Sequence, residues 1–105
     1  MANAVHLNIY KLKKNASTED FLVAIENLVV DEISKKKGFV SFRLMVDGDT
    51  WVDQVTFETM ADLVKFEEDA KNPGETAQHF YSFINFMAKG GRHHKLTVEK
   101  CFPRK

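Results

Sequence analysis

Asp53 is the residue whose type and setting most strongly suggest chemistry. Alternate side chains of an extended segment share a face, which places Asp53 with Trp51, Val55 and Phe57. A carboxyl group among apolar side chains has a raised pKa and can act as a general base near neutral pH. If Asp53 is instead paired with Arg43 or a lysine, its role is structural.

The histidines near the two ends of the chain suggest a different chemistry. His6 shares one side of an alternating segment with Asn8 and Tyr10, so we expect a histidine hydrogen-bonded within a sheet. His93 and His94 are adjacent, which points them to opposite sides of an extended chain, and no acidic residue is near them in sequence. We expect a solvated basic loop there, and no metal site.

The remaining reactive or charged groups have simpler interpretations. Cys101 is the only cysteine, so it can form neither an internal disulfide nor a paired-cysteine metal site, and we expect it to be a packing residue. The triplet 35–37 is all lysine and precedes Gly38, which is typical of a helix terminus and makes a phosphate site the weaker interpretation.

Composition excludes several classes of protein. The chain has 105 residues, enough for one domain over 1–105, and its 15 Lys and Arg balance 15 Asp and Glu, so no overall positive field attracts nucleic acid. No apolar run approaches the roughly 18 residues of a membrane span, and the first residues lack the charged and apolar regions of a secretion signal. We expect a cytoplasmic protein with neither nucleic acid nor a membrane as partner.

Periodicity predicts the elements that must position these residues. Segments with alternating polarity predict four strands, at 5–13, 39–46, 51–58 and 95–102, and the second and third are joined by the tight turn at Asp47-Gly48. Apolar residues at helical spacing predict helices at 17–37, 59–70 and 75–88. Ser17 with Asp20, and Thr59 with Asp62, are typical of helix starts.

The order β-α-β-β-α(α)-β predicts a ferredoxin-like α+β fold, in which a four-stranded antiparallel sheet carries its helices on one face. The second strand is apolar on both sides: Val40, Phe42, Leu44 and Val46 oppose a set that contains Phe39 and Met45. Helices cover only one face of such a sheet, so we expect a second copy of the chain to cover the other. The prediction is a homodimer packed sheet on sheet, a dimeric α/β barrel.

The chain resembles the antibiotic biosynthesis monooxygenase-type dimeric α/β barrel family over residues 5–102. The resemblance rests on Asn8 in the first strand, Gly38-Phe39-Val40-Ser41-Phe42, Val55-Thr56-Phe57-Glu58 and His79-Phe80. In the cofactor-independent monooxygenases of this family, a Trp near the end of the third strand and an Asn four residues earlier belong to the active site. Phe57 and Asp53 stand at the matching positions, so this chain departs from the pattern at both.

A second branch of the same superfamily degrades haem, with an Asn on the first strand, a Trp in the second helix and a His on the next helix. The matching residues are Asn8, Phe66 and His79, so the Trp is missing. The resemblance leaves haem binding through His79 open as an alternative to a site with no cofactor.

Together these observations predict a homodimer that holds a small apolar or aromatic molecule between the helices and the sheet. The resemblance implies oxygenation of a phenol or quinol without metal or flavin, and the alternatives are a non-enzymatic binding protein and a haem-binding or haem-degrading relative. The candidate catalytic residues are Asn8, Asp53 and His79, and the candidate ligand-binding residues are Tyr10, Trp51, Phe57 and Phe66.

Overall fold

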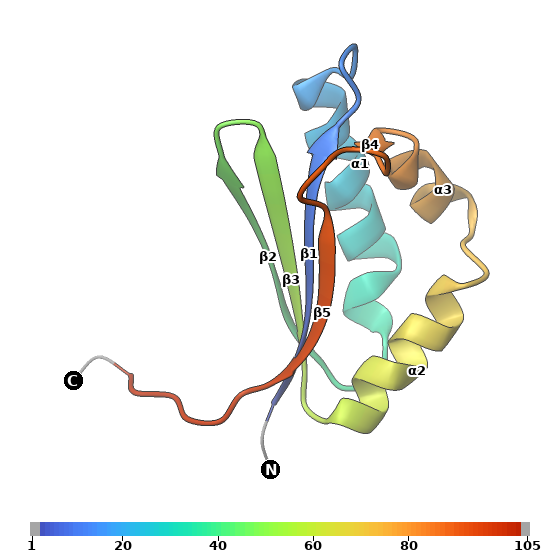
Figure 1. Ribbon diagram of the computed structural model, residues 1–105. Helices are drawn as coiled ribbons and strands as arrows, with labels where there is room; N and C mark the ends of the chain where they lie inside the picture. Colours follow the sequence, from blue (N-terminus) through green and yellow to red (C-terminus); the bar gives the residue numbers. More distant parts are fainter. Residues whose placement is uncertain (1–2, 104–105) are drawn as a thin grey trace.

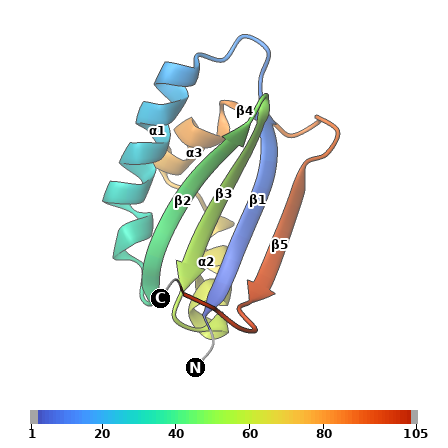
Figure 2. The ribbon, with the colours of Figure 1, turned by 90° about the vertical axis from the view of Figure 1, so that its left-hand side faces the viewer.

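The computed structural model describes residues 3–103 as an α+β fold, with an antiparallel sheet whose helices all lie on one face (Figures 1 and 2). This confirms the predicted fold class. The elements are β1 (Ala4–Leu12), α1 (Thr18–Asp31), a 3₁₀ turn η1 (Ile33–Lys35), β2 (Phe39–Asp47), β3 (Thr50–Phe57), α2 (Met60–Ala70), α3 (Glu75–Tyr81), β4 (Ile84–Asn85) and β5 (Arg92–Thr97).

β1 lies near the middle of the sheet, between β3 on one side and β4 and β5 on the other. β5 pairs with β1 from Ala4 to Ile9, whereas the two-residue β4 pairs only with Lys11 and Leu12. The sheet is therefore four strands wide at any one level, as predicted, and β4 is a short addition at one end.

Two predicted helix starts are confirmed. The Ser17 hydroxyl accepts a hydrogen bond from the Asp20 amide at 3.2 Å, and the Thr59 hydroxyl accepts one from the Asp62 amide at 3.1 Å. Each bond satisfies an amide that the helix itself leaves without a partner. α1 ends at Asp31, earlier than expected, because its last residues tighten into η1 before the chain reverses at Gly38 with φ of +80°.

The largest difference from expectation lies in residues 82–103. The predicted helix 75–88 stops at Tyr81, because the following backbone pairs with the end of β1: the Lys13 amide donates to the Phe83 carbonyl at 2.8 Å, and Ile84 is buried in β4. β5 likewise begins at Arg92 and ends at Thr97, so the expected strand 95–102 is displaced toward the N-terminus. The chain beyond β5 runs away from the sheet (Figure 1), and Cys101, expected to pack, is exposed.

A β-bulge between Phe39 and Ser41 corrects the predicted faces of β2. One extra residue shifts the alternation, so Phe39 lies opposite Phe57, with ring centroids 6.4 Å apart, on the same face as Phe42 and Leu44. The inner face of β2 therefore carries Phe39 in place of the predicted Val40, which is exposed.

β1 carries its polar side chains inward. His6 meets a residue of α2, and the Tyr10 ring lies edge-on to Phe21 of α1, whereas Val5, Leu7 and Ile9 alternate to the outer face. Figure 2 shows that no helix covers this outer face. Within residues 3–103, no helix is long and apolar enough to cross a membrane.

Candidate functional site

A cavity of about 710 Å³ lies between the inner face of the sheet and the helices. This is within the usual size range of small-molecule sites. Most of its wall is apolar, and its polar groups come mainly from β1, β3, α2 and β5. The lining includes His6, Asn8, Tyr10, Phe42, Asp53, Val55, Phe66, Glu67, Phe80, Tyr81, Ile84, Phe86, Arg92 and His93.

Asp53 lies on β3 in the wall of this cavity and is only 3% exposed. Burial raises its pKa to about 6, although the nearby Tyr10 hydroxyl and the hydrogen bond from Asn8 act in the opposite direction. Among the described residues no arginine or lysine forms an ion pair with it; Arg43 lies on the exposed side of β2. The structural role considered for Asp53, as partner of a basic residue, is therefore not supported.

Asn8 and Tyr10 flank this carboxyl group from β1. The Asn8 amide nitrogen donates to Asp53 Oδ1 at 3.3 Å. Burial strongly raises the pKa of Tyr10, and the nearby Asp53 carboxylate raises it further. No well-formed hydrogen bond joins the Tyr10 hydroxyl to Asp53. Tyr10 thus places a buried, protonated hydroxyl without a partner at the cavity wall.

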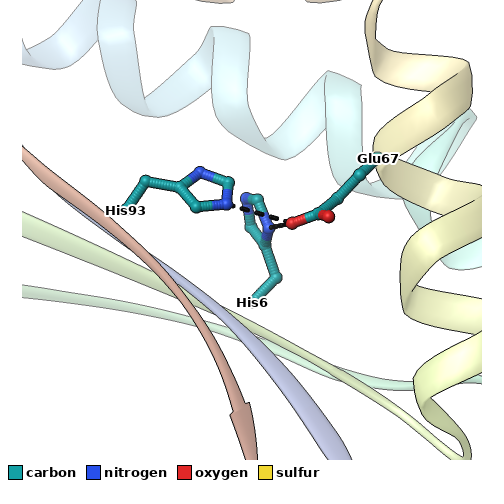
Figure 3. A group of neighbouring side chains, drawn as sticks. All are labelled: His6, Glu67 and His93. Carbon is teal, nitrogen blue, oxygen red and sulfur yellow. Dashed lines mark hydrogen bonds and ion pairs between the residues drawn. The ribbon is translucent and has the colours of Figure 1, made fainter.

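A second cluster of polar side chains lines another part of the same cavity. It consists of His6, Glu67 and His93 (Figure 3). Glu67 Oε2, on α2, is 2.9 Å from Nδ1 of His6 and 3.0 Å from Nε2 of His93. His6 is buried on β1, whereas the His93 side chain, on β5, is half-exposed. The Lys95 ammonium group lies 3.6 Å from the other carboxylate oxygen of Glu67.

The electrostatics of this cluster favour an anionic Glu67 beside a neutral His6. Burial lowers the pKa of His6, and the hydrogen bond to Glu67 only partly compensates. Burial acts to raise the pKa of Glu67, but the hydrogen bonds from His6 and His93 outweigh it, so that pKa is lowered. The expectation of a hydrogen-bonded sheet histidine at position 6 is confirmed.

Four of the seven predicted site residues line the cavity: Asn8, Tyr10, Asp53 and Phe66. The other three lie elsewhere. Trp51 packs on Phe21 at a centroid distance of 5.0 Å, and Phe57 is completely buried beneath Phe66. His79 is exposed on α3, with its ring against Phe83, and is not part of the cavity lining.

The sequence did not indicate Glu67 as a site residue, and it predicted that His93 lies in a solvated loop. Glu67 follows the buried Leu63 by four residues, which puts both on one face of α2, and this spacing was the available signal. His93 lies on β5 directly opposite Asn8, so it points inward while His94 points outward. The acidic partner of His93 is 26 residues away in the sequence, and only the fold brings it close.

No protein-family model matches the chain, and no curated protein resembles it in sequence. Several solved structures share its fold. SnoaB, a cofactor-independent oxygenase from Streptomyces nogalater, is 13% identical with a TM-score of 0.74, the alignment covering 99% of this chain and 100% of that one.

Two further structures are similar over almost their whole length. The ActVA-Orf6 monooxygenase of Streptomyces coelicolor, solved with nanaomycin D, is 16% identical with a TM-score of 0.72 and coverages of 99% and 94%. A dimeric ferredoxin-like protein from an uncultured marine organism is 12% identical with a TM-score of 0.70 and coverages of 100% and 95%. At such identities the likeness establishes the fold, and it confirms the fold expected from the sequence.

Proposed function

We propose that this chain, which has the fold of the antibiotic biosynthesis monooxygenase-type dimeric α/β barrels, is a homodimeric oxygenase of small phenols or quinols. The substrate binds in the cavity between sheet and helices, and Asp53 removes its proton. The observation that carries the proposal is the buried Asp53 carboxyl, whose raised pKa of about 6 lies close to the range that suits a general base at neutral pH.

The groups around Asp53 support this role. Above about pH 6 the carboxyl is ionised and can accept a proton from a phenolic oxygen or from a carbon acidified by neighbouring carbonyl groups. The Tyr10 hydroxyl, protonated and without a partner, can donate a hydrogen bond to the substrate anion. Phe66, Tyr81 and Phe80 supply flat apolar walls.

The proposed reaction is balanced with dioxygen as the sole oxidant. For an anthrone-type substrate, Asp53 takes one proton from the ring CH₂ group, and the resulting anion passes an electron to O₂. Recombination with the reduced oxygen forms a peroxide at that carbon, and the peroxide takes back the proton from Asp53. Loss of water from the peroxide then leaves a carbonyl group, so one oxygen atom enters the product and the other departs in water.

Oxygen uptake with a panel of quinols and anthrones tests the proposal. We expect Asp53→Asn to lower kcat by about 100-fold or more, since a positioned general base contributes at least that much. Asp47→Asn, which removes a carboxylate from the exposed end of β2, is the matched control and keeps full activity. Turnover by Asp53→Asn at the rate of the parent chain would exclude Asp53 as the base.

A non-enzymatic binding protein is the second candidate. It is favoured by Phe57, which stands where the resemblance implies a tryptophan and lies buried beneath Phe66, outside the cavity lining. Saturable binding of an aromatic ligand, without oxygen uptake for any member of the panel, would favour this function over oxygenation.

The homodimer belongs to the same proposal. The outer face of the sheet carries a row of aliphatic side chains across three strands, with Val52 of β3 paired to Ile9 of β1 and to Met45 of β2. These side chains are only partly covered in a single chain. A second sheet packed against them would bury the row. A similar solved structure is described as a dimeric ferredoxin-like protein, which supports a dimer.

A further inference from the structure

We propose that His6, Glu67 and His93 form a binding site for one divalent first-row transition-metal ion at the wall of the cavity. Each residue offers one donor atom, and the three atoms lie within 4.8 Å of one another. The residues come from β1, α2 and β5, so the fold assembles a donor set that no local sequence spacing contains. This proposal is independent of the oxygenase function, because it concerns binding alone.

The distances from Glu67 to the two histidines are those of neighbouring metal ligands. Two donors that each lie about 2.1 Å from a metal, at about a right angle, are about 3 Å apart. Glu67 Oε2 is 2.9 Å from His6 Nδ1 and 3.0 Å from His93 Nε2. A metal ion could therefore replace the two protons that Glu67 Oε2 shares with the histidines.

The donor types select the class of ion. Two imidazole nitrogens and one carboxylate oxygen suit Zn²⁺, Fe²⁺, Co²⁺ or Ni²⁺, whereas Mg²⁺ and Ca²⁺ require a shell of oxygen atoms. Lys95 holds the second oxygen of Glu67 at 3.6 Å, which favours a carboxylate that binds through one oxygen only. Three protein ligands leave at least one coordination position open, and all three residues line the cavity.

The surroundings hold the His6 ring in place, as the outer shell of a metal site does. The ring meets Phe66 edge-on at a centroid distance of 5.5 Å, and its Nε2 atom is 3.0 Å from the amide group of Asn8. When Nδ1 binds a metal, Nε2 carries the proton and donates it. Asn8 can accept this proton after a half-turn of its amide, which presents Oδ1 in place of Nδ2 and gives up the hydrogen bond from Nδ2 to Asp53.

Titration of the metal-free protein with Co²⁺, followed by visible absorption and by calorimetry, tests the proposal. We expect saturation at one ion per chain and displacement of Co²⁺ by Zn²⁺. Glu67→Gln and His93→Ala should each weaken binding by more than about 100-fold, the upper range for loss of an outer-shell partner. The matched controls are Glu68→Gln and His94→Ala, which alter the neighbouring exposed residue on the same element and should bind as the parent chain does.

Circular dichroism of each variant establishes that it is folded, and the half-exposed His93 is chosen over the buried His6 for this reason. Failure of the parent chain to bind Co²⁺ or Zn²⁺ stoichiometrically would overturn the proposal, as would equal affinity in His93→Ala and His94→Ala. The cluster would then be a hydrogen-bonded group that joins α2 to the sheet. Oxygen uptake by the metal-free protein is measured separately, so failure of either proposal leaves the other standing.

Discussion

The Asp53 carboxyl links the candidate site to the pH dependence of folding. Its pKa is about 6 in the folded chain, against a usual value of 3.8, so the folded state holds this proton more tightly than the unfolded state does. The contribution of Asp53 to stability is therefore most favourable below about pH 4. It declines as the pH rises through about 6, by up to about 3 kcal/mol.

Asp53→Asn should remove this decline. We expect the free energy of unfolding of the variant to exceed that of the parent chain at about pH 8 by about 1–3 kcal/mol, with the two converging near pH 4. Urea unfolding at several pH values measures the difference, and Asp47→Asn is again the control. A variant that is less stable than the parent chain at pH 8 would show that the Asp53 carboxylate stabilises the fold.

The Tyr10 hydroxyl lowers the stability of the fold, and we expect it to bind the ligand. Its hydroxyl is buried without a hydrogen-bond partner, so Tyr10→Phe should raise the free energy of unfolding by about 1 kcal/mol. The same change removes the donor offered to a ligand, and the Kd of a phenolic ligand should rise about tenfold. Tyr81→Phe, which alters the other tyrosine of the cavity, is the comparison; a Tyr10→Phe chain that is less stable and binds unchanged would contradict both statements.

At the scale of elements, the junction between η1 and β2 depends on Gly38. Its φ of +80° is unfavourable for other residues, and a Cβ atom there would overlap the Asp62 side chain of α2. Gly48, in the β2–β3 hairpin, also has a positive φ, of +60°, but faces open space. A substitution at Gly48 therefore causes backbone strain alone, whereas one at Gly38 causes backbone strain and steric overlap.

We expect Gly48→Ala to cost about 1–2 kcal/mol of stability, the price of the left-handed conformation alone. Gly38→Ala should cost clearly more, since Asp62 must also move and α2 with it. Urea unfolding of both variants gives the comparison. Equal losses would mean that the Asp62 side chain moves aside freely.

The elements also show what sequence patterns can and cannot predict. Helix starts were predictable because Ser17 and Thr59 act through neighbours three residues away. The end of α3 was not predictable, because Ile84 and Asn85 pair with Lys11 and Leu12, and this contact joins segments that are distant in the sequence. The bulge at Phe39 was equally hidden, since a single extra residue reverses an alternation without changing its composition.

Some residues of the candidate site were likewise predictable from the sequence, and others were not. Alternation alone placed Asn8 and Tyr10 on one side of β1, and Asp53 among apolar neighbours on β3, and these residues do line the cavity. It could not distinguish Phe57, which fills the core, from Phe66, which borders the cavity, because both follow apolar patterns. Glu67 and His93 belong together only through tertiary structure.

For the whole molecule, the outer face of the sheet predicts the oligomeric state. Val52→Lys places a charge in the middle of the aliphatic row and should convert a dimer of about 24 kDa, twice the 12.1 kDa chain, into a monomer. Val23→Lys, on the exposed side of α1, is the control and should leave the mass unchanged. Sedimentation at micromolar concentration measures both; a parent chain that sediments as a monomer would refute the dimer.

β1 serves both faces of the sheet at once, with His6, Asn8 and Tyr10 toward the cavity and Leu7 and Ile9 toward the outer face. An insertion or deletion of one residue between positions 5 and 10 would exchange these faces along part of the strand. The cavity would lose its polar groups in the same event that introduced polar groups among the aliphatic row. Length changes in this segment should therefore be far less tolerated than substitutions, even where each new side chain is small.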